Sequence, residues 1–140
     1  MGGTEIFTPM IGMWILTIAV WVYMYFKRIP FINSLDLSDD DFRPAKFAEM
    51  QPPEVANPSD NLKNLFEVPL LFYAVALYLY VTQQVDTFHV VCAWIFLIFR
   101  VLHSVMHCTK NVVIVRFGFY AVASVACFVM IIRAALAQFL

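Results

Sequence analysis

Four apolar stretches of about membrane length constrain the fold of this chain more than any other feature. They occupy about residues 6–26, 62–81, 88–108 and 112–132 of the 140-residue sequence. Each is long enough to cross a hydrocarbon core of about 30 Å as a helix. Hydrophobic residues make up 62% of the chain and charged residues only 14%, unlike the balance of soluble domains. We therefore predict an all-α integral membrane protein: a bundle of four transmembrane helices forming one domain, residues 1–140.

Basic residues are unevenly distributed over the segments that connect these spans. Those in or beside the first loop (residues 27–61) are Lys27, Arg28, Arg43, Lys46 and Lys63. Lys110 lies in the third loop, and Arg133 alone flanks the opposite side. Because cytoplasmic loops are enriched in Lys and Arg, we predict that the first and third loops are cytoplasmic and both termini extracytoplasmic. In a bacterium the membrane would be the inner one. We also expect a short amphipathic helix at residues 42–50, lying on the membrane surface.

The second span begins with local helix signals. Asn57 can act as the N-cap, and Pro58 suits the first helical position. Pro69 lacks an N–H, so we predict a kink beside Glu67, one turn into the apolar stretch.

Polar side chains in and beside the spans gather in the cytoplasmic half of the predicted bundle. The candidate site residues are Arg28, Lys63, Asn64, Glu67, Arg100, His103, His107, Arg116 and Tyr120. Arg100, His103 and His107 are spaced i, i+3, i+7 and form one stripe on the third helix. Intramembrane charges are costly and usually functional, so we predict a cationic pocket with Glu67 as its carboxylate. It suits an anionic ligand that also carries an ammonium group. We interpret His89, at the outer end of the same helix, as an interface residue.

Other interpretations of this cluster remain open. Glu67 could pair with Arg100, and the histidines could bond across helices, in a purely structural network. The i,i+4 spacing of His103 and His107 would suit a metal ion. However, no carboxylate accompanies them on that helix and neighbouring arginines repel a cation, so we predict no metal. The net charge of −1 argues against nucleic-acid binding through a basic surface.

Three short motifs on three of the spans carry a family resemblance. They are Asn64-x-x-Glu67-x-Pro69, Arg100-x-x-His103 and Arg116-x-x-x-Tyr120. On a four-span chain they resemble the MAPEG family, the membrane-associated proteins in eicosanoid and glutathione metabolism, as a divergent member of bacterial type. The resemblance implies a homotrimer of four-helix protomers. It also implies glutathione as a co-substrate, bound between protomers near the cytoplasmic leaflet.

The resemblance further implies a role for each candidate residue. Arg116 would be catalytic and stabilise the thiolate, and Asn64 and Glu67 would hold the polar ends of the tripeptide. The remaining wall would come from Tyr120, Arg100, His103 and a neighbour's Arg28, while Lys63 and His107 stand where relatives tend to have arginine and tyrosine. The implied function is a glutathione-dependent membrane transferase or peroxidase acting on lipophilic electrophiles from the bilayer. The alternative is a non-catalytic, lipid-binding or scaffold subunit of a membrane complex.

Overall fold

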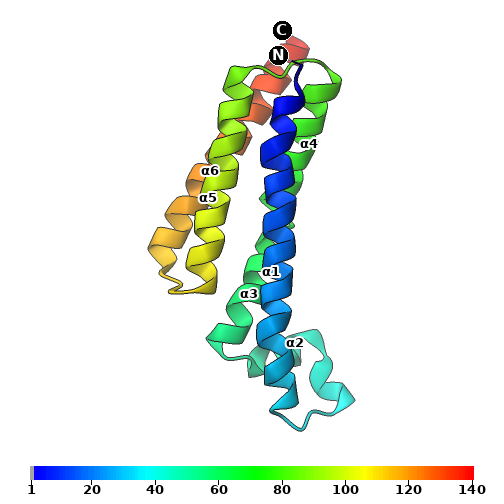
Figure 1. Cartoon of the computed structure of the whole chain (residues 1–140), viewed down its shortest axis with the longest axis vertical. Helices are drawn as coiled ribbons and strands as arrows, with labels where there is room; N and C mark the ends of the chain where they lie inside the picture. Colours follow the sequence, from blue (N-terminus) through cyan, green and yellow to red (C-terminus); the bar gives the residue numbers. More distant parts are fainter. Residues whose placement is uncertain (1) are drawn as a thin grey trace.

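The computed structural model describes residues 2–140, and helices account for most of them (Figure 1). In chain order the elements are the 3-10 helix η1 (Thr4–Ile6), α1 (Phe7–Asn33), the 3-10 helix η2 (Asp39–Phe42), α2 (Pro44–Met50), α3 (Pro53–Asn64), α4 (Val68–Val81), α5 (Thr87–Cys108) and α6 (Val113–Phe139). Four helical segments are long and apolar enough to cross a membrane, with α3 and α4 together forming the second. The predicted all-α, four-span architecture is confirmed, and α2 confirms a short helix in the first loop.

The helices run side by side, with both chain termini at one end and α2 at the other (Figure 1). The most extensive contact is between α5 and α6, which form an antiparallel pair joined by a short turn. The helix α3 packs against α1, and α4 packs against α6. The two halves of the second span therefore have different principal neighbours.

The bundle core is built from large apolar side chains in the middle of the spans. Phe72 of α4 stacks on Phe96 of α5, with ring centroids 4.3 Å apart, and neither ring is exposed. Helix α1 approaches α5 closely at Gly12, where an added Cβ would lie 2.6 Å from Cδ2 of Leu97. Close packing of this kind drives helix association in membranes, where lipid removes the hydrophobic force between helices.

The second span begins earlier than the sequence signals predict. Helix α3 starts at Pro53, after Pro52 in an extended conformation, so the predicted start at Asn57 and Pro58 is wrong. Pro53 takes the first helical position, where its missing N–H costs nothing. Pro58 lies inside the helix and is buried. Asn57 caps no helix. Its side chain accepts a hydrogen bond from Asn111, in the turn between α5 and α6.

The predicted kink beside Glu67 is confirmed and is a complete interruption. Helix α3 ends at Asn64 and α4 begins at Val68, with Glu67 at φ −101° and ψ −104° between them. Pro69 has no N–H to give to the carbonyl of Leu65. At the break the carbonyl oxygen of Asn64 accepts from the backbone N–H of Glu67 over 3.3 Å, and it also accepts a bond from Arg100 of α5.

Candidate functional site

A hollow of about 510 Å³ lies where the end of α3 meets α5 and the start of α6. We call it the Arg116 pocket; its lining residues are Asn64, His103, Val113, Ile114, Arg116, Phe117 and Tyr120. It brings together four of the predicted site residues, which come from three helices. Ile114 and Phe117 are 80% and 64% exposed, so one wall of the pocket continues into the apolar surface of the bundle.

The predicted stripe on α5 turns inward behind this pocket. Arg100 is fully buried, and His103 and His107 are 3% and 4% exposed. Nη2 of Arg100 donates to the backbone oxygen of Asn64 over 3.2 Å, and its guanidinium lies 5.8 Å from the centre of the Tyr120 ring. Among residues 2–140, neither Nε nor Nη1 of Arg100 has a hydrogen-bond partner. This arginine thus keeps unused donors deep inside the bundle.

His103 ties the stripe to the helix that carries Arg116. Its Nδ1 lies 3.1 Å from the backbone oxygen of Arg116. A carbonyl oxygen only accepts, so Nδ1 carries the hydrogen, and Nε2 of a neutral ring is an acceptor. His103 also lies near Tyr120 and His107, with ring centroids 5.9 Å and 5.7 Å away. The imidazole therefore fixes the position of the α6 backbone at the pocket.

The Arg116 side chain has a partner that sequence reasoning missed. Its Nη1 donates to Oδ1 of Asn111, in the turn between α5 and α6. Nδ2 of Asn111 in turn donates to Oδ1 of Asn57 in α3, over 3.4 Å. A turn asparagine gives no sequence signal of this kind, because its contact depends on how three helices meet.

The remaining predicted site residues do not line the Arg116 pocket. Arg28 and Lys63 line a separate hollow of about 320 Å³ beneath the first loop. There Arg28 donates to Oγ of Ser59 over 2.9 Å, and Lys63 lies 3.7 Å from Asp60. Glu67 is exposed in the break between α3 and α4. Within the part of the chain that the structure describes, Glu67 forms no ion pair, so the suggested pair with Arg100 is absent.

A second polar cluster lies at the opposite end of the bundle. Asp86 caps α5 by accepting from the backbone N–H of His89, and both its oxygens bind the guanidinium of Arg133, at 2.9 Å and 2.6 Å. This contact holds the pKa of Asp86 at about 2, below its usual 3.8. His89 is 3% exposed, with Nδ1 2.9 Å from Asp86. The interpretation of His89 as an interface residue is wrong, because the capping carboxylate draws its ring into the bundle.

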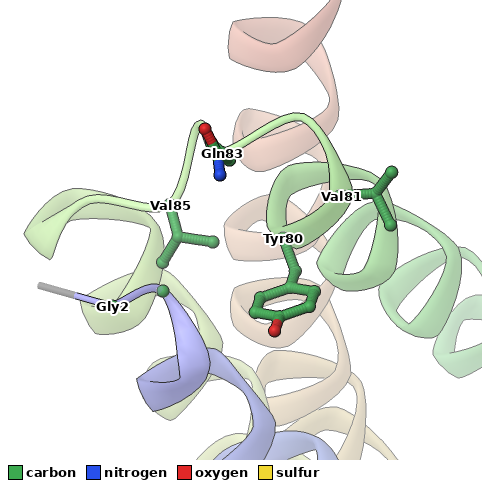
Figure 2. A pocket seen from close by; sticks show the side chains of 6 residues that line it. Gly2, Tyr80, Val81, Gln83 and Val85 are labelled. Atoms are coloured by element: carbon green, nitrogen blue, oxygen red, sulfur yellow. The ribbon is translucent and has the colours of Figure 1, made fainter.

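A hollow at the end of the bundle that carries both termini is a poor candidate for the predicted chemistry. It is about 500 Å³ in volume and lies between the start of the chain and the turn after α4. Figure 2 shows Tyr80 and Val85 lining it, beside the turn that carries Gln83. None of its described lining residues is charged. The cations of the predicted site, such as Arg116, lie at the other end, and Arg133 at this end is paired with Asp86.

The fold and the Arg116 pocket together define a four-span helical membrane protein with cationic side chains gathered at one end of the bundle. A comparison with protein-family models places the chain in a known group. The MAPEG family model matches residues 6–136, nearly the whole chain, and the protein belongs to the MAPEG family. No curated protein and no solved structure matches it.

Proposed function

We propose that this protein is a glutathione-dependent transferase or peroxidase that acts on lipophilic electrophiles in the membrane. The observation that carries the proposal is the Arg116 pocket, where a cation, an imidazole and a phenol meet beside an apolar wall. Family membership supports it, since the family includes glutathione transferases and peroxidases as well as non-catalytic members.

The proposed mechanism is electrostatic. A free thiol has a pKa of about 8.5 and is mostly protonated at neutral pH. The guanidinium of Arg116 would favour the thiolate, while the proton leaves to water at the pocket mouth. In a transfer reaction the sulfur then forms a bond to the electrophilic carbon as the leaving group departs. The electrophile would enter over Ile114 and Phe117, which form the exposed apolar wall.

The proposed glutathione site is shared between protomers of a homotrimer. Glu67, Lys63 and Arg28 stand outside the Arg116 pocket of their own chain, so one chain supplies only part of the predicted ligand set. A neighbouring protomer would bring the missing groups and shield the intramembrane cations from lipid. We expect a trimer mass in mild detergent. A stable monomer that binds glutathione fully would contradict the shared site.

The proposed orientation places the Arg116 pocket near the cytoplasmic leaflet. It rests on the basic residues around the first loop, which is where α2 lies in Figure 1, at the end away from both termini. A reporter fused after Leu140 should therefore report an extracytoplasmic location, and one inserted near Lys46 a cytoplasmic one. The reverse pattern would place the pocket in the wrong leaflet for a cytoplasmic thiol.

Glutathione binding and turnover by the purified protein in detergent test the proposal directly. Arg116→Ala should lower kcat by roughly a hundredfold, the usual loss for one preorganised charge contact in the transition state. Arg133→Ala is the matched control, because it removes an arginine from the same helix at the opposite end. It should leave kcat near the wild-type value. Equal losses in both variants would show that the arginines matter for folding alone.

The pocket lining also supports a second candidate, a lipid-binding or scaffold subunit. Val113, Ile114 and Phe117 present a continuous apolar surface that an acyl chain could occupy. If the correctly folded wild type neither binds glutathione nor turns over an electrophile, the enzyme proposal fails. Copurification of a stoichiometric lipid or membrane partner from the same preparation would then favour the non-catalytic role.

A further inference from the structure

The turn between α5 and α6 is built around a residue in an unusual backbone conformation. Asn111 has φ +49°, a left-handed geometry that asparagine tolerates better than other side-chain-bearing residues. Its N–H donates to the backbone oxygen of Met106 over 2.7 Å, closing the end of α5. This geometry fixes where the Asn111 side chain leaves the turn. It leaves toward α3 and the first turns of α6.

The hydrogen bonds of Asn111 fix which way its amide faces. Its amino group donates to Oδ1 of Asn57, so its oxygen faces the guanidinium of Arg116 and accepts from Nη1. A reversed amide would place two donors against each other on the Arg116 side. Asn57 belongs to α3, the helix that also ends at the pocket residue Asn64. The chain of bonds therefore links the Arg116 guanidinium to both the turn and the second span.

From this geometry we infer that Asn111, oriented by Asn57, is the positioning residue that holds the Arg116 guanidinium at the pocket. An arginine side chain has several rotatable bonds, and an unrestrained one would sample orientations away from the ligand. Asn111 takes one donor and leaves the rest of the guanidinium free for an anion. The Asn111 oxygen is neutral and leaves the positive charge of Arg116 in place, whereas a carboxylate partner would cancel it.

The expected effect on kcat rests on the proposed function. Its size is that of moving the Arg116 guanidinium away from the ligand. Loss of the Asn111 oxygen should lower kcat by about tenfold, because small displacements of a catalytic group are costly. The KM for glutathione should change less than about twofold, since the other proposed contacts to the tripeptide remain. The pKa of the bound glutathione thiol should rise toward its value in solution. If Asn111 had only a structural role, its loss would not change kcat and the thiol pKa while leaving the KM for glutathione nearly constant.

The substitution that isolates the side chain is Asn111→Gly, because glycine accepts a positive φ at no steric cost. The matched control is Gln83→Gly, since Gln83 also has a positive φ (57°) and lies in the turn at the far end of the bundle. The conservative variant Asn111→Asp keeps an oxygen acceptor and tolerates the same backbone. These three variants separate the contact from the turn.

A readout that needs no ligand keeps the inference separate from the proposed function. In protein labelled with ¹⁵N-arginine, an ordered Arg116 guanidinium gives resolved Nη–H signals, assigned by their loss in Arg116→Lys. We expect these signals in the wild type, Gln83→Gly and Asn111→Asp, and their loss in Asn111→Gly. Asn57→Ala should broaden them, because the Asn111 amide is then free to turn.

The inference is supported if Asn111→Gly loses both the signals and kcat, while Gln83→Gly keeps both and Asn111→Asp keeps the signals. Unchanged signals in Asn111→Gly, or equal loss of kcat in Gln83→Gly, overturns it. Loss of the signals in Asn111→Asp as well would also overturn it, since an acceptor would still be present. If the wild type binds no glutathione, the proposed function fails, and the guanidinium signals alone decide the inference.

Discussion

Replacing Arg100 with methionine should stabilise the fold while removing a candidate ligand residue that lies behind the Arg116 pocket. Arg100 is fully buried, and two of its three nitrogen atoms have no partner among the described residues. Each unsatisfied buried polar group costs about 1–3 kcal/mol. Methionine is long enough to fill most of the same space and carries no such cost. The substitution therefore replaces a buried charge that has unpartnered donors with an apolar side chain.

The magnitude follows from what the substitution removes. Relief of two unpartnered nitrogens gains about 4 kcal/mol at the middle of that range. Loss of the bond to the Asn64 oxygen costs about 2 kcal/mol, and loss of the cation–π contact with Tyr120 about 1 kcal/mol. The net expectation is stabilisation by about 1 kcal/mol. Replacements of buried charged groups by apolar residues in other proteins range from neutral to stabilising by about 1–4 kcal/mol.

The assay is reversible unfolding in mixed micelles, with and without glutathione. The control is Leu102→Met, which changes an exposed residue two positions along the same helix and should shift stability by less than about 0.5 kcal/mol. Glutathione at a hundred times its Kd should stabilise the wild type by about 2.7 kcal/mol and Arg100→Met by much less. Destabilisation of unliganded Arg100→Met by 2 kcal/mol or more would refute the reasoning. It would mean that a second copy of the chain already satisfies this guanidinium.

Three further predictions concern the bundle itself. The folded-state pKa of Asp86 is about 2, below 3.8, so its contribution should be complete above pH 3.8 and lost as pH falls through 2. Asp86→Asn should remove that part of the acid dependence in a pH titration of unfolding. Gly12→Val should weaken α1–α5 packing by about 1–3 kcal/mol, whereas Gly118→Ala, with no atom within 4 Å of the added Cβ, should not destabilise. The hydroxyl of Ser104 donates to the fully buried Asn61 over 3.3 Å. A double-mutant cycle of Asn61→Ala and Ser104→Ala, measured by denaturation, should therefore give a coupling energy of about 0.6 kcal/mol. A coupling energy of zero would show that this hydrogen bond does not contribute.

Periodicity and length predicted the features that depend on one helix at a time. The count of spans follows from apolar stretches of about 20 residues, because a single stretch of that length satisfies its backbone groups in lipid by forming a helix. The inward stripe of Arg100, His103 and His107 follows from the 3.6-residue repeat. The interruption near Glu67 follows from the chemistry of Pro69, although propensity did not indicate that the helix would break completely.

Features that depend on how helices meet were beyond the sequence signals. The sequence places Arg28, Lys63 and Arg116 at a similar depth in the membrane. It does not show which side of the bundle each side chain faces, and the structure places the first two in a separate hollow. The ion pair between Asp86 and Arg133 joins residues 47 positions apart. The bond from Asn111 to Arg116 depends on a left-handed turn residue, and asparagine in a turn is too common to predict one.

The unequal lengths of the connections suggest an order of assembly for the chain. The turn of residues 109–112 brings α5 and α6 together at little loop-closure cost, so this pair can form as soon as both helices enter the bilayer. Helix α1 must instead find α3 across residues 34–52, and its contacts with α5 span a still longer separation. Contacts of high sequence separation form slowly. We therefore expect the α5–α6 hairpin to form first and the docking of α1 to be the slow step, so that a protomer with undocked α1 is the intermediate that accumulates during folding.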